Sequence, residues 1–437
     1  MAYPTNLLGA AAINRNPSPI MHIDLNSCFA TIEQQANTLL RGKPIAVAAY
    51  TTPNGCILAP SVEAKKLGVK CGMRVREGRQ LCPNLIVLPP DPRKYRFINR
   101  KLLQLFRAYT PTVEVKSIDE MNLDFGHTLA YKRGLHTVGQ EIKAAIRRDV
   151  GEWMTVSIGI ATNRFLAKLA ANLHKPDGLD EINAANLRPV LARMDLTDLF
   201  GIKEQNKKRL LRVGICTPLN MLDASPQTLL AAFESIIGYY WHLRLRGWEI
   251  DDVDFGRKSI GHSHALKNQR AGPVEVTRLL CKLTEKVGRR MRRLGYAARG
   301  VQVACHYTNG THWQQRALNS TPLFASNDLY RQASQLYTRA PQGKRLHSLA
   351  ISCYNLVKNP LQQLSFLEDE QKKRDLTLAL DAINERWGDF VITPARMMGM
   401  EDTIIDRVSY GSIKDLEEFV YQEEMTSIDP SVFAGSA

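Results

Sequence analysis

Three carboxylates that follow apolar, strand-like runs are the residues of this chain best suited to chemistry. Asp119 and Glu120 follow the strand-like residues 113–116, and Asp24 ends a second apolar run at residues 20–23. Adjacent side chains on a strand point to opposite faces, so a site that uses both acids needs a turn at Asp119 and Glu120. Residues 121–124 can supply the return strand of that hairpin. If the strand ending at Asp24 pairs alongside, the three carboxylates meet at one end of a sheet.

Gathered carboxylates of this kind suit divalent metal ions. Mg²⁺ prefers oxygen ligands and tolerates few protein groups beside substrate phosphates. Two such ions, roughly 3.5–4 Å apart, can hold the attacking and leaving oxygens of an in-line phosphoryl displacement. The alternative is that these acids lie in solvated turns, and the acidic pair alone does not decide between the two interpretations.

Positive charge is concentrated in one part of the chain. The net charge is +15, and residues 256–358 hold 18 Lys and Arg against 3 Asp and Glu. Residues 359–437 are acidic, with 7 basic and 16 acidic side chains. A localised positive field indicates a polyanionic partner, nucleic acid first of all, because each neutralised phosphate releases counterions. A basic surface that serves only solubility is the alternative.

Length and composition indicate a cytoplasmic protein of about three globular domains. No apolar run is long enough for a membrane span, and residues 1–19 lack the pattern of a signal peptide. The eight cysteines are scattered singly, without a Cys-x-x-Cys pair. That spacing argues against a zinc site and a disulfide framework, and it favours reduced thiols.

The periodicity of the first 250 residues predicts a mixture of helices and strands. We expect helices at residues 27–40, 94–109 and 136–150, strands at 45–49, 56–59 and 155–160, and a short helix that Ser61 caps. Another helix follows residue 162, and Lys168 and Lys175 share a face of it if it extends through both. Short helices and turns at residues 187–248 suit a small helical module.

The basic segment predicts a helix at residues 274–294, followed by strands near 301–306 and 349–354. The apolar stripe of this helix leaves four arginines mostly outward, where they could line a phosphate backbone. These residues are Arg289, Arg290, Arg292 and Arg293.

Four motifs together resemble the Y-family translesion DNA polymerases. They are residues 23–30 (Ile-Asp-Leu-Asn-Ser-Cys-Phe-Ala), 117–120 (Ser-Ile-Asp-Glu), 157–161 (Ser-Ile-Gly-Ile-Ala) and 175–178 (Lys-Pro-Asp-Gly). The order of the set is far more specific than any single motif, and the resemblance extends from about residue 20 to residue 358. It implies an α+β, multidomain right-hand polymerase with a ferredoxin-like palm, small fingers, a helical thumb and an α/β little-finger domain.

The resemblance also implies a division of the chain into domains. These are an N-terminal extension (1–19), the palm (20–38 and 89–186), the fingers (39–88), the thumb (187–250), a linker (251–258), the little finger (259–358) and a C-terminal tail (359–437).

Carried over residue by residue, the resemblance implies a two-metal centre. Asp24, Asp119 and Glu120 would be the catalytic carboxylates that hold two Mg²⁺ ions, and the backbone carbonyl of Leu25 would be a further ligand. Mn²⁺ is the expected substitute ion. Phe29 stands where the family has the steric gate, a ring that packs under the sugar and excludes a 2′-hydroxyl. The alternative for Phe29 is an aromatic residue of the core.

Other positions are implied to bind the incoming triphosphate. Ser61, Lys65 and Lys175 fall where the family contacts it. Lys65 replaces an arginine, so it keeps the charge but loses the bidentate fork. Val62 stands where many relatives carry a tyrosine whose hydroxyl reaches a phosphate, which removes one contact. On its own, a lysine on a helix face would be plain solvated surface.

The thumb and the tail carry further resemblances. Residues 201–203 (Gly-Ile-Lys) resemble a helix-hairpin-helix turn whose amides point at a DNA phosphate. Lys203 replaces the usual second glycine beyond Gly201. Residues 363–367 resemble the peptide by which bacterial polymerases bind a sliding clamp, although its last two anchors are in swapped order, and an ordinary loop is the alternative. The candidate clamp-binding residues are Gln363, Leu364, Phe366 and Leu367.

The sequence therefore predicts a template-directed, error-prone polymerase that adds deoxynucleotides to a primer 3′-hydroxyl. The expected partners are primer-template DNA, dNTP and a sliding clamp, and the expected state is a monomer without proofreading or membrane association. The main alternative is a catalytically silent relative that acts as a DNA- and clamp-binding scaffold. The complete acidic trio argues against that alternative. A nucleotidyl cyclase on a similar palm would leave the basic segment unexplained.

Overall fold

The computed structural model describes residues 9–252, 256–266, 271–341, 343–358, 368–388 and 390–400. The chain divides into two compact units, with the boundary between Val253 and Asp254. Both contain helices and sheets, which confirms the α+β, multidomain architecture expected from the sequence. Within the described part of the chain, no helix combines the length and apolar character needed to cross a membrane.

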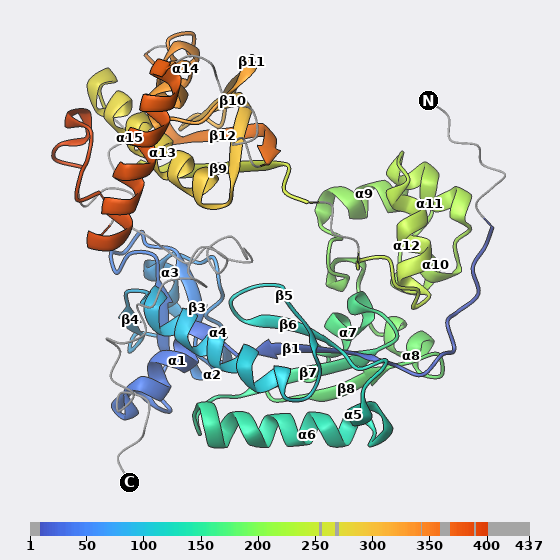
Figure 1. The fold of residues 1–437 in the computed structure, drawn as a ribbon. Helices are drawn as coiled ribbons and strands as arrows, with labels where there is room; N and C mark the ends of the chain where they lie inside the picture. Colours follow the sequence, from blue (N-terminus) through green and yellow to red (C-terminus); the bar gives the residue numbers. More distant parts are fainter. Residues whose placement is uncertain are drawn as a thin grey trace. The chain divides into compact units, whose positions relative to one another are not determined.

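A five-stranded sheet of order β5-β6-β1-β7-β8 organises the first unit (Figure 1). Its strands are β1 (Ile20–Leu25), β5 (Thr112–Val115), β6 (Glu120–Asp124), β7 (Val156–Ala161) and β8 (Leu179–Ile182). β1 runs antiparallel to β6 and β7, and β8 joins β7 in parallel. β5 and β6 pair antiparallel, so the predicted turn at Asp119 and Glu120 is present.

The alternation of β1 separates an apolar face from a polar one. Met21, Ile23 and Leu25 are buried in the main core, where helices α1 (Cys28–Ala36), α4 (Pro92–Arg107) and α6 (Leu135–Ala145) also bury apolar side chains. Figure 1 shows α6 lying along this sheet. His22 and Asp24 point to the opposite face because successive strand residues alternate. The core therefore anchors β1 from one side and leaves the other side for polar groups.

Helix α7 (Arg164–Ala170) crosses β7 on the face that carries Asp24. Gly159 of β7 pairs with His22, and a Cβ at Gly159 would lie 2.0 Å from the Ala167 carbonyl oxygen. Only glycine permits so close an approach of helix to strand. Because α7 ends at Ala170, Lys175 lies beyond it, and the condition under which Lys168 and Lys175 would share a helix face is not met.

A small sheet of order β3-β2-β4 and a set of short helices complete the first unit. The small sheet has β2 (Ile45–Ala48), β3 (Ile57–Pro60) and β4 (Ile86–Leu88), with α2 (Val62–Lys66) and α3 (Val75–Leu81). The other helices are α5 (Leu129–Lys132), α8 (Leu187–Leu191), α9 (Glu204–Arg212), α10 (Pro218–Asp223), α11 (Pro226–Phe233) and α12 (Ile237–Leu245), with the short helical turns η2 (Thr38–Leu40), η3 (Ile146–Val150) and η4 (Leu196–Asp198). The helix expected at residues 27–40 ends at Ala36, and a separate short turn, η2, follows it. The side chain of Leu39 in that turn is exposed, at 74%.

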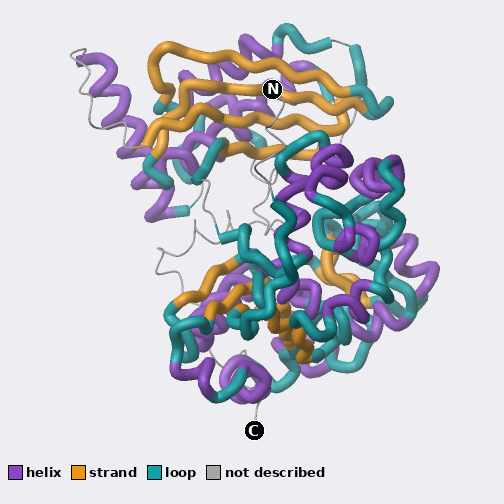
Figure 2. Tube along the Cα trace, turned by 90° about the vertical axis from the view of Figure 1, so that its right-hand side faces the viewer, coloured by secondary structure: helices purple, strands orange, loops and turns teal. Residues whose placement is uncertain are grey.

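The second unit is a four-stranded sheet with long helices. The sheet has the order β11-β10-β12-β9, and Figure 2 shows its strands running side by side. The strands are β9 (Ser259–Ala265), β10 (Tyr296–Tyr307), β11 (His312–Leu323) and β12 (Leu346–Lys358). The helices are α13 (Pro273–Arg293), α14 (Ser326–Tyr337) and α15 (Glu368–Trp387), with the short turn η6 (Ala395–Met397). Apolar residues of α13, α14 and the sheet form one core.

Arg292 of α13 is buried against an acid of α15. It is 9% exposed, and its guanidinium donates to both carboxylate oxygens of Asp381 at 2.5 and 2.8 Å. The same guanidinium donates to the Phe324 carbonyl and the Ser326 hydroxyl. The outward position expected for Arg292 is therefore wrong, because the helical period placed it outside the apolar stripe but could not show that α15 covers it.

The neighbouring arginines of α13 are less buried. Arg289 and Arg293 lie 3.8 and 3.3 Å from the carboxylates of Asp381 and Glu385, and Arg290 donates to the backbone carbonyl of Gly261 in β9. Contacts of these arginines with DNA stay predictions.

We predict that Asp381→Ala destabilises α13 more than Glu385→Ala does. Loss of Asp381 leaves the buried Arg292 charge without its carboxylate, which costs on the order of 3 kcal/mol. The Arg293 and Glu385 side chains are 30% and 47% exposed, and such pairs contribute less than about 1 kcal/mol. Hydrogen exchange of the α13 amides in the full chain measures both effects. Equal effects of the two substitutions would contradict the role given to Asp381.

Candidate metal and nucleotide site

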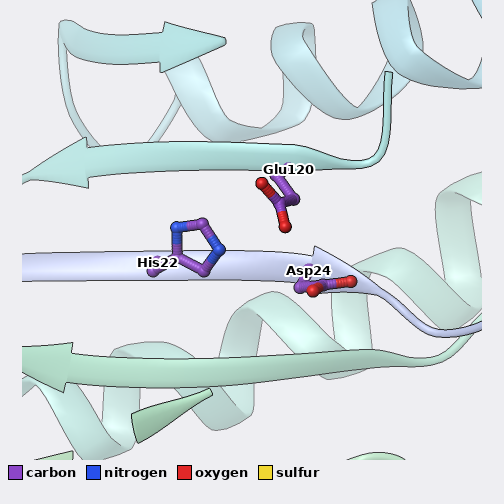
Figure 3. A group of neighbouring side chains, drawn as sticks. All are labelled: His22, Asp24 and Glu120. Carbon is purple, nitrogen blue, oxygen red and sulfur yellow. The ribbon is translucent and has the colours of Figure 1, made fainter. Parts of the chain in front are cut away.

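The pairing of β1 with β6 brings Asp24 and Glu120 together. Asp24 pairs with Glu120, and His22 pairs with Asn122. Figure 3 shows His22, Asp24 and Glu120 grouped between the two strands, and a ligand atom of each lies within 4.8 Å of the others. The sequence predicted the two carboxylates but missed His22, which stands in an apolar run. Its spacing of two from Asp24 is the signal that could have revealed it, because such residues share a strand face.

Asp119 occupies the turn between β5 and β6. The backbone amide of Leu25 donates to the Asp119 carbonyl at 2.9 Å, which ties the turn to the end of β1. The Ser117 hydroxyl donates to the Asp119 carboxylate. Burial raises the pKa of Asp119 to about 6; the Ser117 hydroxyl opposes this shift, and the charges of Asp24 and Glu120 add to it. Asp119 therefore lies within electrostatic range of the other two acids.

His22 is a buried member of this group. Its Nδ1 lies 2.7 Å from Oδ1 of Asn122, and the residue is 1% exposed. Burial lowers the pKa of His22. Its Nε2 is buried and has no hydrogen-bond partner among the described residues. A proton on Nδ1, donated to Asn122, would leave Nε2 with a lone pair, which cannot form a hydrogen bond to an ionised carboxylate because both are acceptors.

Two lysines neutralise the carboxylates. The ammonium of Lys168 donates to both oxygens of Glu120 at 2.7 and 2.6 Å, and that of Lys175 donates to Asp24 at 2.5 Å. Burial alone would raise the pKa of Glu120, but His22, Lys168 and Lys175 together lower it. Glu120 is therefore ionised at neutral pH.

Asn26 holds the loop that carries Lys175. Its amide donates to the Ser157 hydroxyl at 2.9 Å, and its Oδ1 accepts from the Asp177 backbone amide at 2.8 Å. This pair of bonds fastens residues 175–178 beside the ends of β1 and β7.

Lys65 of α2 lies within electrostatic range of Lys175 and Asp24. Burial and then the charge of Lys175 lower the pKa of Lys65, while the charge of Asp24 opposes the shift.

The donor set fits a divalent metal. Asp24, Asp119 and Glu120 offer the oxygen ligands that hard cations take, and lysine ammonium groups already occupy two of these carboxylates. The two ammonium groups, those of Lys168 and Lys175, show that the carboxylates attract positive charge to the site.

Comparisons with known proteins identify the family of this chain. A model of the impB/mucB/samB family matches residues 23–172, and a model of the C-terminal domain of that family matches residues 257–366. The DNA polymerase IV of Pelotomaculum thermopropionicum is 33% identical over 86% of this chain and 94% of its own length. DNA polymerase IV 1 of Bacillus subtilis is 29% identical over 88% of this chain and 94% of its own length.

The chain belongs to the Y family of translesion DNA polymerases. It is a DNA-directed DNA polymerase, as the sequence predicted. Two solved structures share the fold at 22% identity, each covering 78% of this chain and 99% of its own: a Y-family polymerase chimera of Dbh and Dpo4 (TM-score 0.66) and an insertion ternary complex of Dbh DNA polymerase (TM-score 0.55).

The Y-family gate position, Phe29, lies at the start of α1. Phe29 is 4% exposed, and its ring stacks on Tyr95 of α4 with centroids 4.2 Å apart and an interplanar angle of 10°. Cys28 is also buried, and burial, followed by the charges of Asp119 and Asp24, raises its pKa well above 9.0. Phe29 therefore follows a residue close to the carboxylates, while its ring also packs in the core. The gate role stays a prediction.

Ser61 is fully buried at the start of α2. Its hydroxyl accepts from the backbone amides of Ile45 and Ala64 and donates to the Lys43 carbonyl. These bonds make Ser61 the helix cap that the sequence predicted. A contact of Ser61 with substrate stays a prediction, and the saturated hydroxyl does not favour it.

The turn at Gly201, which the resemblance assigns to a thumb, has a backbone conformation that favours glycine. Gly201 has a φ of +95°, and Lys203 is exposed immediately before α9. The Gly201 carbonyl accepts from the Asn206 side chain at 3.0 Å. DNA contacts of Gly201 and Lys203 stay predictions. The candidate clamp-binding residues Gln363, Leu364, Phe366 and Leu367 lie outside the described residues.

We predict that Asp119→Asn stabilises the metal-free chain at neutral pH. The folded pKa of about 6 exceeds the usual 3.8, so the stabilisation from a protonated Asp119 is complete below pH 3.8 and is lost as pH rises through 6. Asparagine carries no charge to bury, so the variant should exceed the parent at pH 7 by on the order of 1 to 3 kcal/mol.

Denaturant unfolding in a metal chelator at pH 5 and pH 7 measures this difference. Glu141→Gln is the control, because Glu141 is an acid of α6 whose side chain is 39% exposed and pairs with Arg133. A stability gain from Asp119→Asn that is the same at both pH values would contradict the raised pKa.

Proposed function

We propose that this polymerase transfers deoxynucleotides to a primer 3′-hydroxyl at a two-Mg²⁺ centre built from Asp24, Asp119, Glu120 and the Leu25 carbonyl. The observation that carries the proposal is the pairing of Asp24 with Glu120 across β1 and β6. When bound, the ions would lower the pKa of the 3′-hydroxyl and stabilise charge on the transferring phosphoryl group, and Mn²⁺ could replace Mg²⁺.

The lysines of the site supply triphosphate binding in this proposal. Lys175 and Lys65 lie within electrostatic range of each other, and the charge of Lys175 contributes to the lowered pKa of Lys65. An anionic triphosphate would relieve their mutual repulsion and give both ammonium groups a partner. Val62, at the start of α2, cannot donate the hydroxyl hydrogen bond that a tyrosine would supply. The protein's main task is then to position the reactants.

We further propose that Phe29 excludes ribonucleotides. Phe29 directly follows Cys28, and burial, followed by the charges of Asp119 and Asp24, raises the pKa of the Cys28 thiol. This closeness to the carboxylates supports a position of Phe29 near the sugar of the incoming nucleotide. Stacking on Tyr95 would hold the ring against displacement by a 2′-hydroxyl.

The proposed partners are primer-template DNA, dNTP and a sliding clamp. The exposed Lys203 at the thumb turn and the basic second unit support DNA binding, because both offer positive charge to phosphates. Clamp binding rests on residues 363–367 alone. Its test must leave α15 in place, since truncation after Lys358 would also remove Asp381 from the buried Arg292. Synthesis as a monomer without proofreading belongs to the same proposal.

Primer extension with Mg²⁺ on a primed template tests the two-metal centre. Asp119→Asn should abolish extension although it raises the stability of the metal-free chain, whereas Glu141→Gln should extend at the parental rate. Unchanged extension by Asp119→Asn would refute the metal assignment. If the parent binds primed DNA but extends nothing, the scaffold alternative holds.

Sugar discrimination tests the gate. Phe29→Leu should raise the ratio of ribonucleotide to deoxynucleotide incorporation roughly 10- to 100-fold, because the smaller side chain leaves room for a 2′-hydroxyl. Leucine is preferable to alanine because it keeps more of the packing on Tyr95. Phe29→Tyr retains the ring and should keep the parental ratio. Equal ratios in Phe29→Leu and the parent would remove the gate role.

A further inference from the structure

Lys168 joins a catalytic carboxylate to the thumb turn. Its ammonium donates to both oxygens of Glu120 and lies 4.2 Å from the ring centroid of Phe200. Phe200 stands directly before Gly201 and is 61% exposed. A single cation thus contacts the acid that the proposed reaction uses and the ring beside the turn that is predicted to bind DNA.

The elements that place Lys168 are held firmly. Gly159 lets α7 approach β7, which carries Lys168 to the face of Glu120. Asn163 caps α7 at the Leu166 amide, and its side-chain nitrogen donates to the carbonyls of Arg244 and Trp248. The start of α7 is therefore fixed to residues at the end of α12 and just beyond it.

The long side chain of Lys168 is the flexible part of this arrangement. A lysine ammonium on four rotatable carbons loses much conformational freedom when it is held in one place. The Phe200 ring offers a second attraction, because an ammonium over an aromatic face is stabilised by the ring's quadrupole. An ammonium attracted by the Phe200 ring is thereby favoured in the position in which it binds both oxygens of Glu120.

We propose that Lys168 is a positioning residue for Glu120 and that Phe200 of the thumb turn holds Lys168 in place. The proposal rests on the proposed polymerase reaction, in which Glu120 must be ionised and correctly oriented. Lys168 orients the carboxylate and, in the absence of DNA, competes with a divalent ion for it. The thumb turn thereby influences the catalytic acid without contacting it.

Metal binding to the DNA-free full chain tests the competition. Lys168→Met should bind Mn²⁺ roughly two- to fivefold more tightly than the parent, as measured by electron paramagnetic resonance of free Mn²⁺, because a competing cation is removed. Lys168→Arg keeps the charge and should bind Mn²⁺ as the parent does. Equal affinities in Lys168→Met and the parent would overturn the role of Lys168.

A double-mutant cycle on the single-turnover extension rate tests the link to Phe200. Phe200→Ala should slow extension roughly three- to tenfold while the Kd for primed DNA stays within about twofold, because the ring acts through Lys168. In the Lys168→Met background, Phe200→Ala should have no further effect. Leu211→Ala, which removes another exposed apolar side chain of the thumb at 44% exposure, is the matched control and should be silent.

Additive effects of the two substitutions would show that Phe200 acts independently of Lys168, and a Kd for DNA that rises with Phe200→Ala would show that Phe200 contributes to DNA binding. Either result would overturn the link. A parent chain that extends no primer would refute the proposed function instead. The Mn²⁺ titration would still test Lys168 in that case, since it needs no turnover.

Discussion

The antiparallel pairing of β1 with β6 is the constraint on which the rest of the site depends. One alignment buries Met21 and Ile23 in the core and places Asp24 opposite Glu120. A shift of one residue would send Asp24 into the core and the apolar side chains toward the site. The apolar core therefore fixes the geometry of the carboxylates, and stability and site geometry are specified by the same pairing.

That geometry concentrates negative charge in a partly buried place, which opposes folding. Burial raises the pKa of Asp119, whereas the neighbouring charges of His22 and Lys168 outweigh burial at Glu120 and lower its pKa. Lys168 can reach Glu120 because Gly159 brings α7 close to the sheet. Buried charge of this kind is expected at functional sites, where the requirements of ligand binding and of folding conflict.

The second unit shows why a charge count overstates a surface field. Residues 256–358 carry 18 basic against 3 acidic side chains, a surplus as large as the net charge of the whole chain. Arg292, however, pairs with Asp381, and Arg289 and Arg293 lie near acids of α15. Acids of α15, which follow this segment in the chain, thus neutralise part of its positive charge. The charge available to a polyanion is that of the side chains left exposed, and this depends on how α15 lies against α13.

Much of the architecture followed from the sequence alone. The apolar runs ending at Asp24 and before Asp119 predicted strands and a hairpin, because period-two patterns report which side chains share a face. The ordered motifs identified the family, and the pairing of β1 with β6 brings together Asp24 and Glu120, two of the three carboxylates that were predicted to bind metal. Tertiary structure alone decided that His22 joins this group, that Lys168 binds Glu120 and that Arg292 is buried. A sequence period reports the face on which a residue lies, but only packing determines which other element covers that face.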